Sequence, residues 1–288
     1  MMNLPWPGAV VAGIGTIVAG IGVLYTVSKI GKLRKKQQLR KKWDSIGKDV
    51  VLLHQFQRGK YCVNLSPFAI KVETYLRLAK IKYEVDSNSP FGPKKKCPWI
   101  TLNGEDVGDS EMVIQKLSQH FDVNLDSHLD EVTQAQLEAV RVMADEFVFW
   151  IVIAWRYWLD GCVTFLKSQS FPPFLNRAFP YMMTSTIKKR SINQGVGVHS
   201  PEEIYQMAKK SCGTLSTILG DSPYFGGDQP STADCAIFGQ LAQLMWNAPG
   251  SQYEALVREL YPSLGNYCNR MKDTIFPDWN KLLNPPLE

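Results

Sequence analysis

Short apolar runs alternate with polar loops over residues 50–121. Residues 50–56 are rich in β-branched side chains and predict a buried strand, and residues 81–85 predict a second one. Between them, Ser66 and Pro67 open an amphipathic helical pattern, since serine is a favoured N-cap and proline fits the first helical position. Strand, helix and strand in this order predict a parallel pair.

A second group of elements follows directly. Residues 97–102 form an apolar run with Pro98 near its start, where a strand loses no ladder hydrogen bond. Asn103-Gly104 is a strong two-residue hairpin signal, so residues 105–108 should pair back antiparallel. An acidic and polar stretch then caps a helix over 112–121. The predicted order is β-α-β and then β-β-α.

The rest of the chain has a helical pattern. Residues 168–200 contain three prolines and a basic triplet, and we expect them to be less regular. Ser231 and Asp234 form a capping box ahead of a buried helix. The predicted helices cover residues 130–159, 202–219, 235–246 and 262–275.

The N-terminal region differs from everything after it. Residues 9–28 carry no charge, and a run of roughly 20 residues is the length of a transmembrane helix. Eight Lys and Arg residues follow before Asp44, which by the positive-inside rule places the body of the protein in the cytosol. We therefore expect a single-pass membrane protein, in the mitochondrial outer membrane or the endoplasmic reticulum.

The composition of the chain argues against nucleic-acid binding, a disulfide framework and a metal site. The net charge of +5 comes from the region near the N-terminus, so the body has no nucleic-acid signature. Six scattered cysteines without a Cys-x-x-Cys pair do not predict a disulfide framework, and four histidines at unrelated spacings predict no metal site. The length of 288 residues suits an anchor and a body of two parts.

The β-α-β-β-α unit, with proline entering its third strand and an acid-serine pair after its fourth, resembles the thioredoxin-like domain of glutathione transferases. A longer string resembles the failed axon connections family, which is related to metaxins and to nematode cadmium-responsive membrane proteins. The resemblance covers about residues 50–279. It is carried by Ser66-Pro67-Phe68-x-x-Lys71-x-Glu73-Thr74-Tyr75-Leu76-Arg77 and by Pro98-Trp99-Ile100.

The resemblance implies an α/β fold followed by an all-α fold. A thioredoxin-like, glutathione-binding domain would occupy residues 48–122. An all-helical transferase C-terminal domain would occupy residues 123–288. The transmembrane anchor and its basic flank would occupy residues 1–47.

The resemblance also implies a glutathione site. Ser66 would be the catalytic residue, whose hydroxyl holds the glutathione sulfur as a thiolate beside a helix N-terminus. Pro98 would be the family's cis-proline, presenting the backbone of Cys97 to the ligand. Asp109 and Ser110 would hold the γ-glutamyl group. A cation for the glycine carboxylate would come from Lys94, Lys95 or Lys96, although loop lysines are usually only solvated.

The roles of four further residues stay open from sequence. Trp155 and Trp158 would line a pocket for a hydrophobic electrophile, or else belong to the core, as aromatic residues at helical spacing usually do. Cys62, in the loop before the predicted helix, would face a bound thiol or be an ordinary loop cysteine. Asp145 would polarise a substrate or pair with a nearby arginine.

The resemblance implies two functions. One is a membrane-anchored transferase that conjugates glutathione, as co-substrate and without a metal, to hydrophobic electrophiles. The other is a non-catalytic, metaxin-like adaptor that uses the same fold for protein interactions. A homodimer is usual in the transferase superfamily and stays open for an anchored chain.

Overall fold

The computed structural model describes residues 34, 37–168 and 173–286. The chain divides into two units, Met1–Lys48 and Asp49–Glu288, and we call the second unit the body. In the first unit, residues 37–44 are helical. The predicted transmembrane stretch lies outside the described residues. Within the described ranges, no helix has the length and apolarity needed to cross a bilayer.

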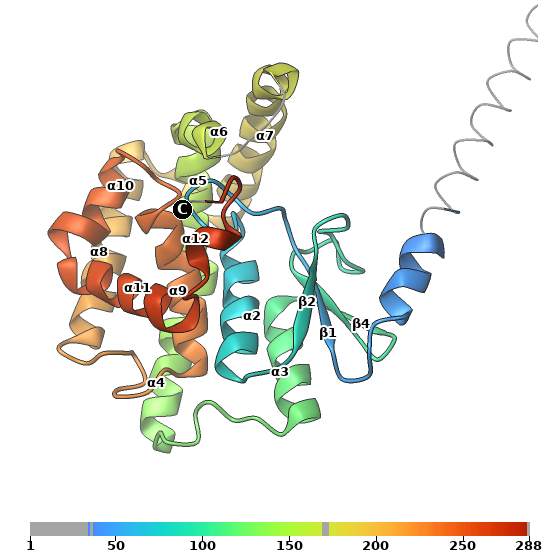
Figure 1. Cartoon of the computed structure of the whole chain (residues 1–288). Helices are drawn as coiled ribbons and strands as arrows, with labels where there is room; N and C mark the ends of the chain where they lie inside the picture. Colours follow the sequence, from blue (N-terminus) through green and yellow to red (C-terminus); the bar gives the residue numbers. More distant parts are fainter. Residues whose placement is uncertain (1–33, 35–36, 169–172, 287–288) are drawn as a thin grey trace, which may run out of the picture. The chain divides into compact units, whose positions relative to one another are not determined.

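The first half of the body contains a four-stranded sheet of order β2-β1-β3-β4 (Figure 1). β1 is parallel to β2 and antiparallel to β3, and β4 pairs back on β3, which confirms the predicted parallel pair and hairpin. The elements are β1 (Val51–His54), α2 (Pro67–Leu78), β2 (Tyr83–Asp86), β3 (Trp99–Leu102), β4 (Glu105–Gly108) and α3 (Ser110–Phe121).

The second half of the body is helical, as the sequence predicts. Residues 131–159 are helical throughout, but they alternate between α and π geometry, which the apolar pattern does not reveal. The elements are α4 (Glu131–Val142), η1 (Met143–Val148), α5 (Phe149–Ala154), η2 (Trp155–Leu159), α6 (Val163–Lys167), α7 (Pro173–Gln194), η3 (Val196–Val198), α8 (Pro201–Leu219), α9 (Thr232–Met245), α10 (Gln252–Ala255), η4 (Leu256–Leu260), α11 (Pro262–Ile275) and α12 (Trp279–Leu282).

Helix α7 corrects one prediction. The sequence predicts a less regular stretch over residues 168–200, yet most of it is a helix of 22 residues with Pro180 inside it. An internal proline removes one helical hydrogen bond. Apolar packing of α7 compensates for this lost hydrogen bond, because Ile187 is buried and Phe179 stacks on Phe165 of α6 with ring centroids 4.9 Å apart.

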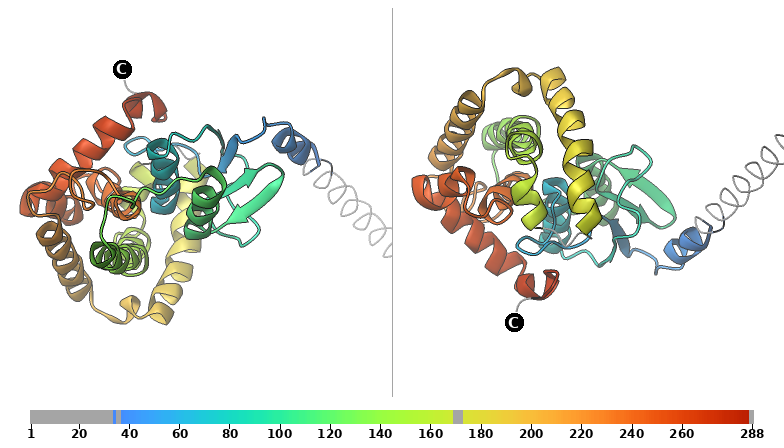
Figure 2. Two further views of the ribbon diagram at one scale, coloured as in Figure 1. Left: turned by 90° about the horizontal axis from the view of Figure 1, so that it is seen from below. Right: turned by 90° about the horizontal axis from the view of Figure 1, so that it is seen from above.

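The two halves meet where α2 packs against α9, and α2 lies between the sheet and the helices of the second half (Figures 1 and 2). The contact is so close that a Cβ added to Gly239 of α9 would lie 2.4 Å from the carbonyl oxygen of Pro67. The predicted capping box at the start of α9 is confirmed, with Ser231 and Asp234 bonded to each other's backbone. The residues of all three apolar core clusters lie after residue 49, so the body should fold without the first 48 residues.

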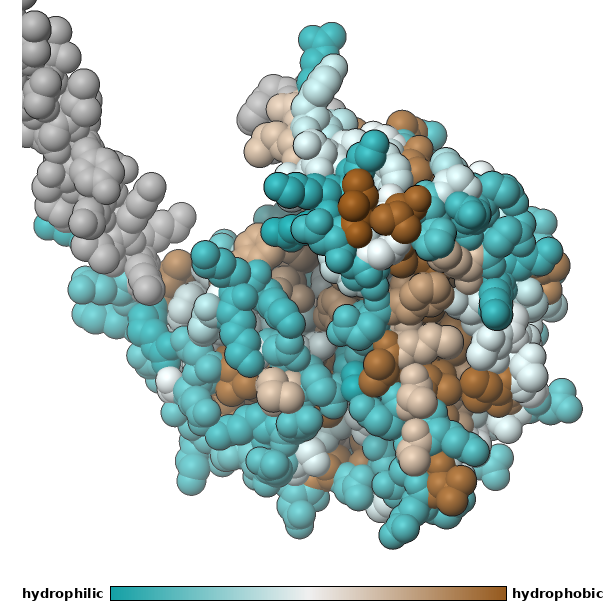
Figure 3. All heavy atoms as spheres, turned by 180° about the vertical axis from the view of Figure 1, so that it is seen from behind, coloured by the Kyte–Doolittle hydropathy of each residue, from teal (hydrophilic) through white to brown (hydrophobic). Residues whose placement is uncertain are grey.

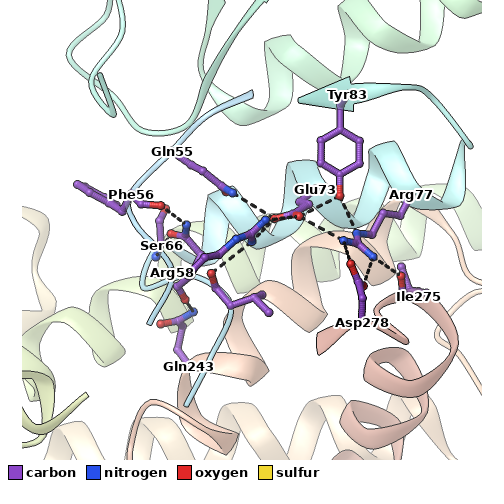
Figure 4. A network of polar contacts seen from close by, with 12 residues as sticks. Gln55, Phe56, Arg58, Ser66, Glu73, Arg77, Tyr83, Gln243, Ile275 and Asp278 are labelled. Carbon is purple, nitrogen blue, oxygen red and sulfur yellow. Dashed lines mark hydrogen bonds and ion pairs between the residues drawn. The ribbon is translucent and has the colours of Figure 1, made fainter. Parts of the chain in front are cut away.

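Two charged side chains of α2 form a buried polar network (Figure 4). Glu73 is fully buried, and Arg58 donates to its carboxylate twice, at 2.7 and 2.8 Å. Arg77 donates to Asp278, near the C-terminus, at 2.6 and 3.0 Å. Tyr83 of β2 joins the two pairs, because it donates to Glu73 and accepts from Arg77. The loop before α2 and the last part of the chain are thereby tied to the same helix.

A third charged residue of α2, Lys71, is also fully buried. Its ammonium group donates to Glu111 of α3 at 2.8 Å and to Asp145 of η1 at 2.6 Å. Arg141 of α4 completes the cluster by donating to Asp145 at 3.0 Å. Asp145 therefore forms ion pairs with Lys71 of the first half and with Arg141. Pairing with a nearby arginine was one of the alternatives that the sequence left open.

We expect Glu73→Gln to destabilise the body by about 3–5 kcal/mol, because it removes the fully buried charge of the pair and leaves the largely buried guanidinium of Arg58 without a countercharge. The measurement is the free energy of urea unfolding. Glu105→Gln is the matched control, since it breaks the exposed pair with Lys116 and should cost less than about 1 kcal/mol. Equal losses for the two variants would contradict the account.

The same pair predicts a pH dependence. Burial alone would raise the pKa of Glu73, but the bonds and charge of Arg58 lower it below the ordinary glutamate value. Its stabilisation is therefore complete above the ordinary value and is lost as the pH falls through the lower folded-state pKa. We expect the stability difference between wild type and Glu73→Gln to shrink from neutral pH to about pH 3. Urea unfolding at a series of pH values tests this, and a constant difference would refute it.

Candidate functional site

Three segments singled out by the sequence lie at one end of the sheet. His54 at the end of β1 lies opposite Trp99 at the start of β3, and Trp99 lies opposite Gly108 at the end of β4. The loop to α2, the residues entering β3 and the residues following β4 therefore leave the sheet at the same end. We call these residues the sheet-end site: Ser66, Cys97, Pro98, Asp109 and Ser110.

Ser66 has the predicted N-cap geometry. Its backbone is extended, and its hydroxyl oxygen accepts a hydrogen bond from the amide of Ala69 at 3.3 Å. Accepting through the oxygen leaves the hydroxyl proton available to donate to a ligand. The first amides of α2 add the positive end of the helix dipole. The side chain is buried at 7% exposure, so a ligand could approach only its outer edge.

Side chains of the second half fix the backbone just before Ser66. Asn64 accepts the amide hydrogen of Ser66 at 2.9 Å, and its own carbonyl accepts from Gln243 of α9 at 3.2 Å. Arg156 of η2 donates to the carbonyl of Leu65 at 3.3 Å and to Gln243 at 2.9 Å. The guanidinium of Arg156 is buried at 1% exposure. It places positive charge close to the residue that precedes Ser66.

The bond between Cys97 and Pro98 is cis, as the resemblance implied. The thiol of Cys97 is a feature that sequence reasoning missed, since only its backbone was assigned a role. Burial raises the pKa of this thiol to about 12, although contacts with the Phe56 backbone and the Ser66 hydroxyl favour the thiolate. The Cys97 thiol and the Ser66 hydroxyl are therefore neighbours. The position of Cys97 directly before a proline at the start of a strand is the sequence signal that could have indicated a role for its thiol in the site.

Asp109 and Ser110 begin α3. Asp109 has a positive φ of 86° and caps the helix by accepting from the amide of Glu111 at 3.1 Å. Its other carboxylate oxygen accepts from Lys96 at 2.6 Å. Burial alone would raise the pKa of Asp109, but Lys96 and the helix amides lower it, so the carboxylate is ionised at neutral pH. Lys96 thus pairs with the acid of the site, a contact that the sequence did not predict.

The other open positions lie further into the helical half. Trp155 is buried and stacks on Tyr253 with ring centroids 4.7 Å apart, so it belongs to the core and the structure offers no support for a pocket role. Trp158 is partly buried, and the ammonium of Lys188 lies 5.1 Å from its ring centroid. Cys62 is a free cysteine in the loop before α2, one of the two alternatives, and its side chain is fully buried in the main core.

Hollows in the surface of the body do not by themselves identify the site. Seen from behind, the surface is hollowed between the sheet and the helices, and pale and brown residues lie in the hollow (Figure 3). A cavity of about 440 Å³ lies elsewhere, along α11 and α12 between Lys272 and Lys281, and it contains none of the sheet-end residues. The chemistry of the sheet-end residues therefore identifies a candidate site better than the hollows in the surface do. Within the described part of the chain, no group of His, Cys, Asp or Glu side chains could hold a metal ion.

Family models match both halves of the chain. Residues 67–162 match the glutathione S-transferase N-terminal domain, and residues 208–271 match the glutathione S-transferase C-terminal domain. The fold also matches a glutathione transferase family member from Pseudomonas fluorescens pf-5 that was solved with two glutathione bound. That match has a TM-score of 0.52 at 15% identity and covers 81% of this chain and 92% of the other. It establishes the fold alone.

Three curated relatives align with most of this chain. Failed axon connections of Drosophila melanogaster is 34% identical over 251 residues, which are 82% of this chain but only 60% of the fly protein. Metaxin-2 of Mus musculus is 23% identical and aligns over 81% of this chain and 91% of its own length. Isoprene-epoxide–glutathione S-transferase of Rhodococcus sp. strain AD45 is 26% identical, over 73% of this chain and 92% of its own length.

We expect one thiol to react first in the native protein. All six cysteines are free, and all are buried except Cys97, which is partly exposed. Because its pKa is raised to about 12, alkylation should be slow at neutral pH and should speed up about tenfold per pH unit. Mass spectrometry after brief iodoacetamide treatment tests this, with Cys97→Ser as the control. Earlier labelling of Cys212 or Cys268 would contradict the geometry.

Proposed function

Because this chain is a homologue of failed axon connections with glutathione S-transferase-like domains and metaxin relatives, we propose that it binds glutathione at the sheet-end site and conjugates it to hydrophobic electrophiles. The observation that carries the proposal is the meeting of a capped helix N-terminus, a cis-proline and an acid-serine pair at one end of the sheet. Each of these features suits a different part of glutathione.

Ser66 would act on the sulfur. Its hydroxyl accepts from Ala69 and has a proton left to donate, so it can stabilise a thiolate together with the amides of α2. The thiolate would attack an electrophilic carbon to form a thioether. The thiol proton of glutathione would pass to water. The electron pair of the broken bond would go to the displaced group, which leaves as an anion, or to the epoxide oxygen, which stays on the product and takes a proton from water. The buried cation of Arg156 would favour the thiolate through the field at the start of α2.

The two ends of glutathione would be held by charge. The ionised carboxylate of Asp109 suits the γ-glutamyl ammonium, and the hydroxyl of Ser110 suits its carboxylate. Lys96 pairs with Asp109 from an exposed position, with 64% of its side chain in solvent. A turn of this long side chain would free the acid for the ligand and bring the ammonium of Lys96 toward the glycine carboxylate.

The Rhodococcus relative supports the enzymatic proposal. Its name describes a transferase that joins glutathione to an epoxide, and it aligns with this chain over 92% of its own length. The electrophile for this chain would be of similar chemical class, a small hydrophobic compound with a strained or activated carbon.

We also propose that residues 9–28 anchor the protein in a membrane with its body in the cytosol. The support is the uncharged stretch of sequence and the eight basic residues that follow it. A glutathione site on the cytosolic side would have access to the cellular pool of reduced glutathione. The anchor would hold the site close to compounds dissolved in the bilayer.

A non-catalytic adaptor is the second candidate. The relation to metaxin-2 over 91% of that protein favours it, and so does the engagement of Ser66 and Asp109 in contacts within the body. In this alternative the fold would serve protein interactions at a membrane, and the sheet-end residues would only cap their helices.

Calorimetry with reduced glutathione distinguishes the two candidates. We expect the body, residues 49–288, to bind glutathione and Asp109→Asn to bind it at least about tenfold more weakly, because the variant keeps the cap but loses the charge. Asp130→Asn is the matched control, since Asp130 caps α4 in the same way. Ser66→Ala should raise the pKa of bound glutathione, whereas Ser200→Ala, which also alters a serine cap followed by proline, should not.

Two outcomes would refute the enzymatic proposal. One is a folded body that shows no heat of binding at millimolar glutathione. The other is equal binding by Asp109→Asn and wild type. Binding without conjugation of any epoxide or aryl halide, measured by mass spectrometry of the products, would leave a glutathione-binding adaptor.

A further inference from the structure

One stretch of the body has an unusual charge. Residues 161–201 contain no Asp or Glu and five Lys or Arg residues. The body as a whole is acidic, because nine of the 32 Lys and Arg residues but only one of the 27 Asp and Glu residues precede Asp49. The stretch that contains α7 therefore carries a net charge of +5 within a body whose net charge is −3 (23 of the 32 basic and 26 of the 27 acidic residues).

The outward side of α7 combines this charge with exposed apolar residues. Tyr181 is 86% exposed and Met182 is 69% exposed, and Ile192 is 42% exposed further along the same side. Lys189 and Arg190 are also exposed. Figures 1 and 2 show α7 (yellow) on the outside of the helical half. We call the exposed side chains of residues 177–194 the α7 face.

The opposite side of α7 is already used in the fold. Ile187 is buried, Phe179 lies against the aromatic rings of Tyr157 and Phe165, and Thr184 donates to the carbonyl of Tyr157 at 2.8 Å. These contacts fix which side of the helix faces outward. The α7 face is thus presented by a helix that is held in place, and it runs about 17 Å from Tyr181 to Ile192.

We propose that the α7 face lies on the surface of a bilayer that contains anionic phospholipid. A helix that carries Lys and Arg together with aromatic and aliphatic residues on its exposed side, and no acid, is suited to the interface between headgroups and acyl chains. Anionic headgroups would attract the basic residues, and Tyr181 and Met182 would enter the boundary region. This contact is separate from the glutathione site and from the sequence before residue 49.

Vesicle flotation of the body, residues 49–288, tests this inference without the predicted anchor. Wild type should float with phosphatidylcholine vesicles that contain phosphatidylserine and much less with phosphatidylcholine alone, and salt should weaken binding. Lys189→Glu/Arg190→Glu should reduce binding about tenfold or more. Lys209→Glu/Lys210→Glu, an equal charge change at exposed positions of α8, should reduce it far less.

A second pair of variants tests the apolar residues. Tyr181→Ser/Met182→Ser should weaken binding several-fold, whereas Val132→Ser/Val142→Ser, at exposed positions of α4, should leave it unchanged. Circular dichroism melting shows that each variant is folded.

Three results would overturn the inference. The first is no flotation of wild type with anionic vesicles. The second is an equal loss for the α7 and α8 charge reversals, which would indicate a general charge effect. The third is binding of the α7 face to an acidic peptide but not to vesicles, which would assign the face to a protein partner.

Discussion

Buried charges on α2 constrain the rest of the body. A charge removed from water is tolerated only when it is paired and hydrogen-bonded, and α2 brings Lys71 and Glu73 fully inside. Their partners come from the loop before the helix, from α3 and from η1, and Arg77 adds the segment that holds Asp278. The helix that Ser66 caps is therefore fixed from several directions. Lys71, Glu73 and Arg77 are three of the nine residues named in the Ser66–Arg77 string that resembles the failed axon connections family.

Local rules were enough to predict much of the fold. The cap at Ser66, the hairpin at Asn103-Gly104 and the capping box at Ser231 depend on neighbouring residues, so the sequence shows them directly. Helix α7 was missed because prolines were taken as breaks, whereas packing on α6 and η2 decides the outcome. Asp145 in the π-helical segment η1 pairs with Lys71 of α2, and no local pattern encodes a contact between segments so far apart in sequence.

The local geometry of the candidate site could be predicted, but its contacts could not. Ser66 caps α2, Asp109 caps α3 and the bond before Pro98 is cis, whereas the binding of glutathione by these residues stays a prediction. The neighbouring Cys97 thiol and the pairing of Lys96 with Asp109 join residues far apart in sequence. Such contacts depend on strand register and side-chain direction, so they became visible only in the structure.

The central claim is that glutathione binds where α2, β3 and α3 begin. Its most direct test is a titration of the isotope-labelled body with reduced glutathione, followed by amide shifts in two-dimensional NMR spectra. The account predicts that the largest shifts fall on Ser66, Ala69, Cys97 and Ser110, with little change along α7. Shifts confined to other regions, such as α11 and α12, or no shifts at millimolar glutathione, would contradict it.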